Sequence, residues 1–267
     1  MYISVLYAIS ICGHMEPLLI TVATVILSAV LSAEAYKLQC LTKDGALASF
    51  VVGAIVGVFG SLNAFFLLTV FTVAGFFATL RGIDKKKAAG LQEGQRGERT
   101  WKNIVGVGLP PVLVVLLNYV YPLSPELFAI LFISTITVAG ADTIASEIGV
   151  RDPKVYMITT FKRVEPGVNG GVSLTGTAVS TVASLLIAIL GWFVMMGNLD
   201  ILLLIPFVAG VVGNLMDSVF GAVLENTGYI SKYTNNCSTA LIGAAFGAVA
   251  FTLGEVLYTS VLSHVLV

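Results

Sequence analysis

Acidic side chains lie inside long apolar segments of this chain, where an ionised group is costly and usually functional. Asp142 and Glu147 come near the end of one such segment. As a helix, this segment would put Asp142 and Ser146 on one face, and Thr143 and Glu147 on a neighbouring face. Small residues around them would let another helix approach closely. The stretch therefore predicts a polar stripe that meets a second helix.

A second polar stripe is predicted near the end of a later apolar segment by an i, i+3, i+4, i+7 spacing. Its members are Asn214, Asp217, Ser218 and Gly221. Oxygen ligands at this density suit Mg²⁺, which takes one or two carboxylates and leaves its other positions to water and phosphate. We therefore expect Asp142 and Asp217 to hold Mg²⁺, with Glu147 and Asn214 as direct or water-mediated ligands. The alternative is that each Asp only caps or hydrogen-bonds a neighbouring helix.

A basic pair and a glycine-rich turn stand directly before another apolar segment. Lys162 and Arg163 supply fixed cations, and the glycines allow close approach of backbone amides to an anion. The residues of this turn expected to bind a nucleotide are Gly167, Asn169, Gly170, Gly171 and Ser173. A Walker A sequence, GxxxxGK[ST], is absent. The other interpretation is a flexible turn with charges that only orient the protein in a membrane.

Two further groups are expected to contribute to nucleotide binding. Asn235 and Asn236 form a second polar return that runs into a helix start. Arg96 and Arg99 belong to a locally basic stretch, 81–102, which can meet anionic headgroups or a polyphosphate. The net charge of −1 gives the chain no global basic field, so nucleic acid is not an expected partner.

The elements that must position these residues are membrane-spanning helices. The 267 residues are 57% hydrophobic and 11% charged, with a mean hydropathy of +0.96, whereas soluble domains are roughly 25% charged. The apolar segments long enough to cross a bilayer are 17–36, 45–62, 64–80, 104–121, 126–148, 172–197, 201–224 and 239–264. We predict an all-α, polytopic transmembrane helical bundle of about eight spans, without a soluble domain. Seven spans result if the tight pair around Ser61–Asn63 is one re-entrant hairpin.

The basic residues predict the orientation of this single integral membrane domain, residues 1–267. All 14 Lys and Arg fall in alternate connections. The positive-inside rule then places the loops 37–44, 81–103, 150–171 and 225–238 in the cytoplasm and both termini outside a cell membrane. The polar stripes and the glycine-rich turn would lie on the cytoplasmic face.

The same topology places both histidines, His14 and His264, on the outer side, so a reaction at the cytoplasmic face must proceed without a histidine base. Phosphoryl transfer to a lipid monophosphate meets this condition. The acceptor has a second pKa near ~6 and is already largely ionised, so positioning, Mg²⁺ and cations are what the enzyme must supply. The three cysteines, Cys12, Cys40 and Cys237, form no CxxC pair, which argues against a zinc site.

Three sequence blocks, in this order and spacing, resemble the phytyl-phosphate kinase family of membrane proteins, which includes the eukaryotic transmembrane protein 19. They are ADTIASEIG at 141–149, ITTFKRVEPG at 158–167 with NGGVSLTGT at 169–177, and GNLMDSVFGA at 213–222. Asn169 and Ile144 stand where that family often has Asp and Trp, and Asn169 therefore removes one possible metal-ligand carboxylate.

The resemblance implies conversion of an isoprenoid monophosphate, phytyl or another polyprenyl phosphate, to its diphosphate with a nucleoside triphosphate, CTP or ATP, as donor. In this interpretation Lys162 and Arg163 bridge the donor and acceptor phosphates beside Asp142 and Asp217. The partners are a membrane lipid, the isoprenoid monophosphate and the nucleotide; the sequence predicts no oligomeric state. A CTP-dependent lipid cytidylyltransferase and a secondary transporter are the alternatives, and the transporter is disfavoured because the polar residues gather at one face rather than at midmembrane.

Overall fold

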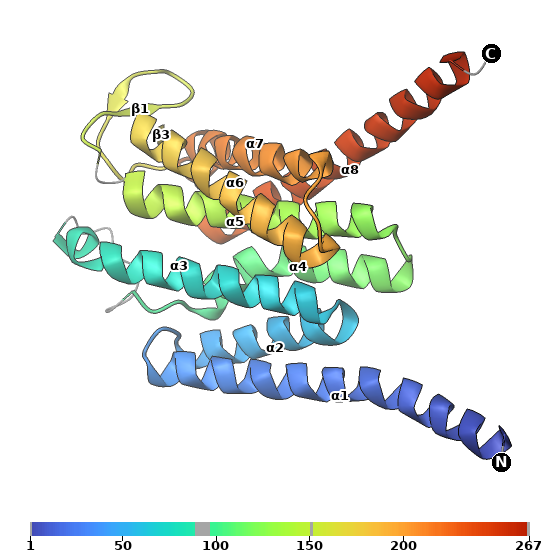
Figure 1. The fold of residues 1–267 in the computed structure, drawn as a ribbon. Coiled ribbons are helices and arrows are strands. Elements are labelled where there is room, and N and C mark those ends of the chain that lie inside the picture. The colour runs from blue at the N-terminus through green and yellow to red at the C-terminus, as the bar shows by residue number, and fades with distance from the viewer. Residues whose placement is uncertain (1, 89–96, 150–151, 266–267) are drawn as a thin grey trace.

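The computed structural model describes residues 2–88, 97–149 and 152–265, with side chains described for 18–77, 97–149 and 152–260. In this part of the chain the backbone forms a bundle of eight α-helices (Figure 1). Their bounds are α1 Tyr2–Lys37, α2 Lys43–Phe59, α3 Leu62–Ala88, α4 Trp101–Val120, α5 Pro125–Gly149, α6 Leu174–Met196, α7 Leu204–Phe220 and α8 Lys232–Val265. The predicted all-α membrane bundle is confirmed.

Six of these helices are long and apolar enough to cross a bilayer, as judged over the described residues. The exceptions are α2, with 17 residues, and α3, whose shorter apolar part is Leu62–Phe77. Because α2 ends at Phe59 and α3 begins at Leu62, Gly60 and Ser61 alone join the two helices. The tight pair expected from the sequence is thus a short helical hairpin.

Helix α5 lies at the centre of the bundle and packs against α3, α4, α6, α7 and α8 (Figure 1). In the most apolar stretch of α5, 83% of the residues are buried, whereas 44% or less are buried in the corresponding stretches of the other candidate spans. Small residues make this possible, because close helix packing in a membrane needs backbones that can approach. A side chain at Gly149 would come within 3.1 Å of Gly176 Cα on α6, and side chains at Gly210 or Gly213 of α7 would collide with Thr137 or Val138 of α5.

Two features of the fold depart from plain helices. Between α5 and α6 a small antiparallel sheet with strand order β2-β1-β3 is formed by β1 Val155–Met157, β2 Arg163–Val164 and β3 Gly171–Val172. After a short 3-10 turn at Ile201–Leu203, α7 runs on into a π-helical turn, Gly221–Glu225. The sequence predicted a glycine-rich turn where the sheet lies, because strands of two or three residues are too short to produce an alternating hydrophobic pattern.

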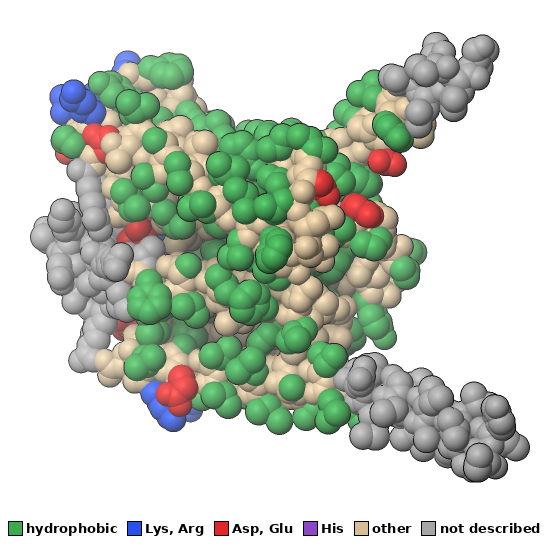
Figure 2. Space-filling model, in the orientation of Figure 1, with side chains coloured by type: hydrophobic (Ala, Val, Ile, Leu, Met, Phe, Trp, Pro, Cys, Tyr) green, Lys and Arg blue, Asp and Glu red, His purple; other side chains and the backbone are tan. Residues whose placement is uncertain are grey.

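The sheet, the π-helical turn and the described parts of the connections α1–α2, α3–α4, α5–α6 and α7–α8 lie at one end of the bundle, and the start of α1 and the end of α8 lie at the other (Figure 1). On the face shown in Figure 2, Lys and Arg side chains lie at the loop end. The bundle therefore gathers the basic connections at one end, as the alternation predicts. That this end faces the cytoplasm stays a prediction.

Candidate functional site

The last two turns of α5 present one polar edge to a cavity at the loop end of the bundle. Asp142, Ala145, Ser146 and Gly149 line this cavity with i, i+3, i+4, i+7 spacing. Glu147 is 5% exposed and does not line the cavity. The structure therefore brings Asp142 to the site and leaves Glu147 on a different face of the same helix.

Helix α7 forms the facing wall with the stripe predicted from its spacing. Asn214, Asp217, Ser218 and Gly221 all line the cavity. The Ser180 hydroxyl of α6 donates a hydrogen bond of 2.8 Å to Asn214 Oδ1. Because the Ser180 hydroxyl donates this hydrogen bond, the Asn214 atom that faces Ser180 is the amide oxygen and not the amide nitrogen.

The glycine-rich turn forms the roof of the cavity and is docked on the π-helical turn of α7. The segment Gly167–Gly171 lines the cavity. Gly170 has a φ of +77°, and a Cβ on it would lie 2.5 Å from Ala222 Cβ. Asn226 Nδ2 donates a hydrogen bond of 2.9 Å to the carbonyl oxygen of Asn169. Only glycine fits position 170, since a side chain would be strained by the backbone conformation and would also collide with Ala222.

The start of α6 continues this roof into the membrane-spanning part. Ser173 is buried and caps α6, its Oγ accepting a hydrogen bond of 3.0 Å from the Gly176 amide. A serine N-cap satisfies one amide of the first helical turn. Thr177, one turn further along α6, is an exposed residue that also lines the cavity.

Helix α8 supplies the buried support for Asp217. Asn235 is 1% exposed, and its Nδ2 donates hydrogen bonds of 3.1 Å to the Asp217 carbonyl oxygen and 3.3 Å to Glu225 Oε2. Thr239 Oγ1 donates to Asp217 Oδ2 at 3.3 Å. Lys232 and Asn236 line the cavity beside them. Asn235 thus acts on the site through Asp217 and Glu225 and does not itself line the cavity.

The cavity that these elements enclose has a volume of about 360 Å³. Three of its lining residues are acidic, Asp142, Asp217 and Glu225, and Lys232 is the one basic residue among the described residues that line it. Asp142, Glu225 and Lys232 are all close enough to Asp217 to interact with its charge. An excess of carboxylates in a cavity between membrane helices attracts cations.

The donor set fits Mg²⁺ in part. Carboxylate, amide and hydroxyl oxygens are the ligands that this ion prefers. Over the described ranges, no three His, Cys, Asp or Glu side chains are grouped closely enough to hold a metal by themselves. A bound Mg²⁺ would therefore take the rest of its ligands from water and from substrate phosphates, as this ion commonly does.

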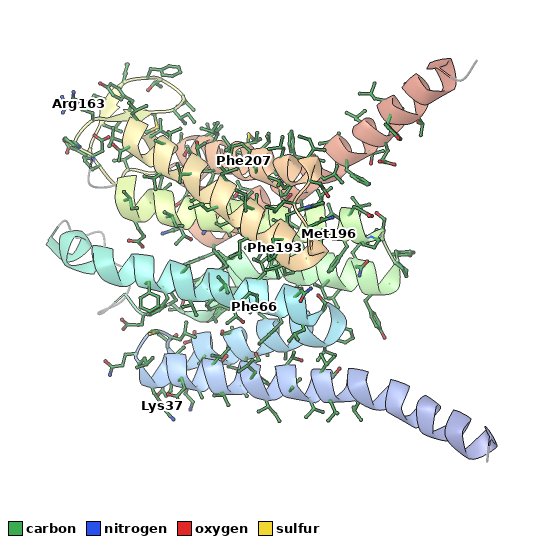
Figure 3. All side chains as sticks on the ribbon, in the orientation of Figure 1. Lys37, Phe66, Arg163, Phe193, Met196 and Phe207 are labelled. Carbon is green, nitrogen blue, oxygen red and sulfur yellow. The ribbon has the colours of Figure 1, made fainter. Side chains whose placement is uncertain are left out.

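Several residues predicted for the site lie elsewhere. Lys162 and Arg163 are exposed on the β1–β2 hairpin and do not line the cavity. Arg163 Nη2 donates a hydrogen bond of 3.1 Å to the Pro153 carbonyl, and Figure 3 shows this side chain at the outer edge of the sheet. Arg99 pairs through its backbone with Leu41 and lines a different, mostly apolar cavity among α1–α4. Arg96 lies outside the described residues.

Two charged residues that were given no role at the site line it. Glu225 is recognisable from the sequence as one of the intramembrane acids near this end, and it continues the α7 stripe, since it lies four residues after Gly221. Lys232 was interpreted only as a residue that orients the protein in the membrane. Its position three residues before Asn235, on the same helical face at the start of α8, was the available signal.

Comparison with known proteins gives one family and several relatives. The family model described as integral membrane protein DUF92 matches residues 26–254. The membrane protein MJ0933 of Methanocaldococcus jannaschii is 30% identical over 238 residues, which cover 89% of this chain and 97% of that protein. Protein PGR of Arabidopsis thaliana is 31% identical over 78% of this chain and 80% of its own length. Protein VTE6, chloroplastic, of the same plant is 29% identical over 80% of this chain and 65% of its own length. No solved structure matches the chain.

Proposed function

The chain belongs to the DUF92 family of integral membrane proteins, and we propose that it is an isoprenoid monophosphate kinase that forms the prenyl diphosphate from a nucleoside triphosphate. The family resemblance indicated by the three motif blocks is confirmed. The kinase activity that this resemblance implies is the part we propose. The observation that carries it is the cavity in which the motif residues Asp142 and Asp217 meet the glycine-rich turn.

The reaction needs no protein base. An oxygen of the prenyl monophosphate attacks the γ-phosphorus of the nucleotide, the bond from that phosphorus to the β–γ bridging oxygen breaks, and the nucleoside diphosphate leaves with the electron pair. Because the second pKa of a phosphate monoester is near ~6, the attacking oxygen carries its charge at neutral pH.

The lining residues then have two tasks. Asp142 and Asp217, with Asn214, would hold Mg²⁺, which would supply positive charge beside the phosphates. The Lys232 ammonium binds phosphate oxygens together with amides of the Gly167–Gly171 turn other than those of Val168 and Gly171, which donate to carbonyl oxygens of the same loop. We assign the bridging cation role to Lys232 rather than to Lys162 and Arg163, because Lys232 lines the cavity.

The lipid substrate reaches this cavity from the side. Leu215 of α7 is 38% exposed and Thr177 of α6 is also exposed, and both line the cavity as well as the outer surface. A prenyl chain can therefore stay in the bilayer along α6 and α7 while its phosphate enters between them. Leu185 and Phe193, 36% and 55% exposed, show that α6 offers apolar surface to the bilayer. Trp192 of the same helix is fully buried and faces the core, so it does not contribute to this surface.

The experiment is product analysis with purified protein, Mg²⁺, labelled CTP or ATP and a panel of prenyl monophosphates. Prenyl diphosphate with CDP or ADP is the expected product. Pyrophosphate with a CDP-lipid would identify the cytidylyltransferase instead, and flux into vesicles without turnover would identify a transporter.

Matched variants test whether the site is responsible. Asp142→Asn and Asp217→Asn should each abolish most of the turnover. Glu126→Gln is the control, because Glu126 lies in the first turn of the same helix as Asp142, at the opposite end of the bundle. Near-normal turnover in both aspartate variants would exclude this cavity as the active site.

A further inference from the structure

The β1–β2 hairpin carries exposed groups that the cavity does not use. Phe161, at its turn, is 79% exposed and has a φ of +54°. This left-handed conformation is uncommon for a bulky residue and costs energy that some interaction must offset. Tyr156 of β1 is 43% exposed, and the basic residues Lys162 and Arg163 follow Phe161 directly. An aromatic side chain held outward beside two cations indicates a partner outside the described fold.

The hairpin is held rigidly against the start of α6. Tyr156 pairs with both Arg163 and Val172, so the hairpin is part of one sheet with the strand that leads into α6. Asp152 accepts a hydrogen bond of 2.9 Å from the Lys154 amide. This hydrogen bond, together with those from Thr175 in the first turn of α6, holds the pKa of Asp152 below its ordinary value. The hairpin therefore keeps a fixed position relative to a membrane-spanning helix.

This position puts the turn close to the membrane surface. Val172 lies two residues before α6, whose first residue, Leu174, is 86% exposed. The turn stays close to the sheet, because the Phe161 amide donates a hydrogen bond of 2.8 Å to the carbonyl oxygen of Met157 in β1. A headgroup layer is roughly 6 Å thick, and charges act over a further Debye length of about 8 Å. The turn thus stays within range of the headgroups of the bilayer that α6 crosses.

We propose that the β1–β2 hairpin is a membrane-surface anchor whose partner is the layer of anionic phospholipid headgroups. Phe161 and Tyr156 occupy the interface, where aromatic side chains are favoured. Lys162 and Arg163 bind lipid phosphates, and each cation near an anionic surface contributes roughly fivefold, or about 25-fold together. No acidic residue lies within the turn 158–163 to oppose them.

The anchor has a consequence for the roof of the cavity, although the proposal does not depend on the proposed function. The chain runs from β2 directly into the Glu165–Gly170 segment and from there to β3. Holding the hairpin at the surface therefore restrains the turn that packs on Ala222. A more anionic membrane would then restrain the Glu165–Gly170 segment more strongly over the cavity.

The test places a fluorescent reporter on the turn of the full-length protein. Cys12, Cys40 and Cys237 are replaced by Ala, and a single cysteine at Phe161 is labelled with an environment-sensitive dye. Nanodiscs contain phosphatidylcholine alone or with phosphatidylglycerol, plus a lipid spin-labelled near its headgroup as a quencher. The matched control is a label at Tyr229, which is 81% exposed on the α7–α8 connection at the same end.

The label at position 161 should emit at shorter wavelength than the control and be quenched by the spin-labelled lipid, more strongly with phosphatidylglycerol. Emission and quenching equal to the control at Tyr229 would overturn the anchor. Protection that arises only on addition of nucleotide and Mg²⁺ would also overturn it, because the hairpin would then be a lid over the cavity.

A second measurement keeps Phe161 in place. Amide hydrogen exchange of residues 158–163 should be slower in anionic than in neutral nanodiscs. The double variant Lys162→Gln and Arg163→Gln should lose this difference, up to the roughly 25-fold expected from two cations. Equal exchange rates in anionic and neutral nanodiscs for the unmodified protein would contradict the proposal.

Discussion

Replacing Gly170 by Ala tests whether the roof of the cavity must dock on the π-helical turn. The added Cβ would lie 2.5 Å from Ala222 Cβ, and the residue would keep a φ of +77°. Gly197, the C-cap of α6 at the opposite end of the bundle, has a φ of +76° and nothing within 4 Å of an added Cβ. Gly197→Ala therefore introduces the same backbone strain without a collision, which makes it the matched control.

The expected effect of Gly170→Ala on roof docking follows from the energetic difference between the two variants. Backbone strain of about 1–2 kcal/mol is common to both variants. Overpacking at Ala222 adds about 1–3 kcal/mol at Gly170 alone. If the roof responds by undocking, the docked population falls by roughly 5- to 150-fold, since about 1.4 kcal/mol corresponds to a tenfold change.

Nucleotide dependence of turnover and thermal unfolding in detergent would measure these effects. Gly170→Ala should raise the nucleotide KM by that factor, whereas Gly197→Ala should lower the unfolding temperature and leave the KM unchanged. The collision is with the backbone as well, because the added Cβ would also lie 2.6 Å from Ala222 N and 2.7 Å from Ala222 Cα, so the two segments must separate. Equal KM values for the two glycine variants would refute the docked roof.

Three further predictions follow from the same site. Lys232→Ala should lower kcat/KM by roughly 10- to 150-fold, which corresponds to the loss of a hydrogen bond to a charged group. Lys154→Ala is the control, because Lys154 does not line the cavity, and it should change kcat/KM little. Equal losses in the two variants would argue against Lys232 as the cation that binds phosphate. Asp217→Asn should weaken Mn²⁺ binding, measured by electron paramagnetic resonance, and unchanged binding would remove Asp217 from the metal site. In sealed right-side-out vesicles, an impermeant thiol reagent should miss a cysteine at Thr159 and label one at Leu199, and the reverse pattern would invert the proposed orientation.

The helices and their polar stripes could be predicted because both depend on periodicity within one segment. The spacing of Asn214, Asp217, Ser218 and Gly221 is a property of any helix with that sequence, and all four line the cavity. The grouping of basic residues at one end followed for a similar reason, since alternate connections of a helical bundle must share a side.

The remaining features depend on contacts between distant segments, which periodicity does not encode. Glu147 was expected beside Asp142, yet the rotation of α5 within the bundle turns it away from the cavity. Lys162 and Arg163 were expected to face the site because they are close in sequence to the glycine-rich turn. Pairing of β1 with β2 carries them to the outer edge of a sheet instead. The π-helical turn likewise has no sequence signature that would have predicted the docking of Gly170 on Ala222.

The central position of α5 also has a consequence for how the protein is made. Three of the five helices that surround α5, namely α6, α7 and α8, follow it in the sequence and therefore leave the ribosome later. During synthesis α5 enters the bilayer with Asp142 and its buried Ser and Thr residues still facing lipid or the insertion machinery. Asp217 meets Asn235 and Thr239 only after the start of α8 has emerged. A nascent chain that stops before residue 235 thus contains both aspartates but lacks the hydrogen bonds that Asn235 and Thr239 donate to Asp217.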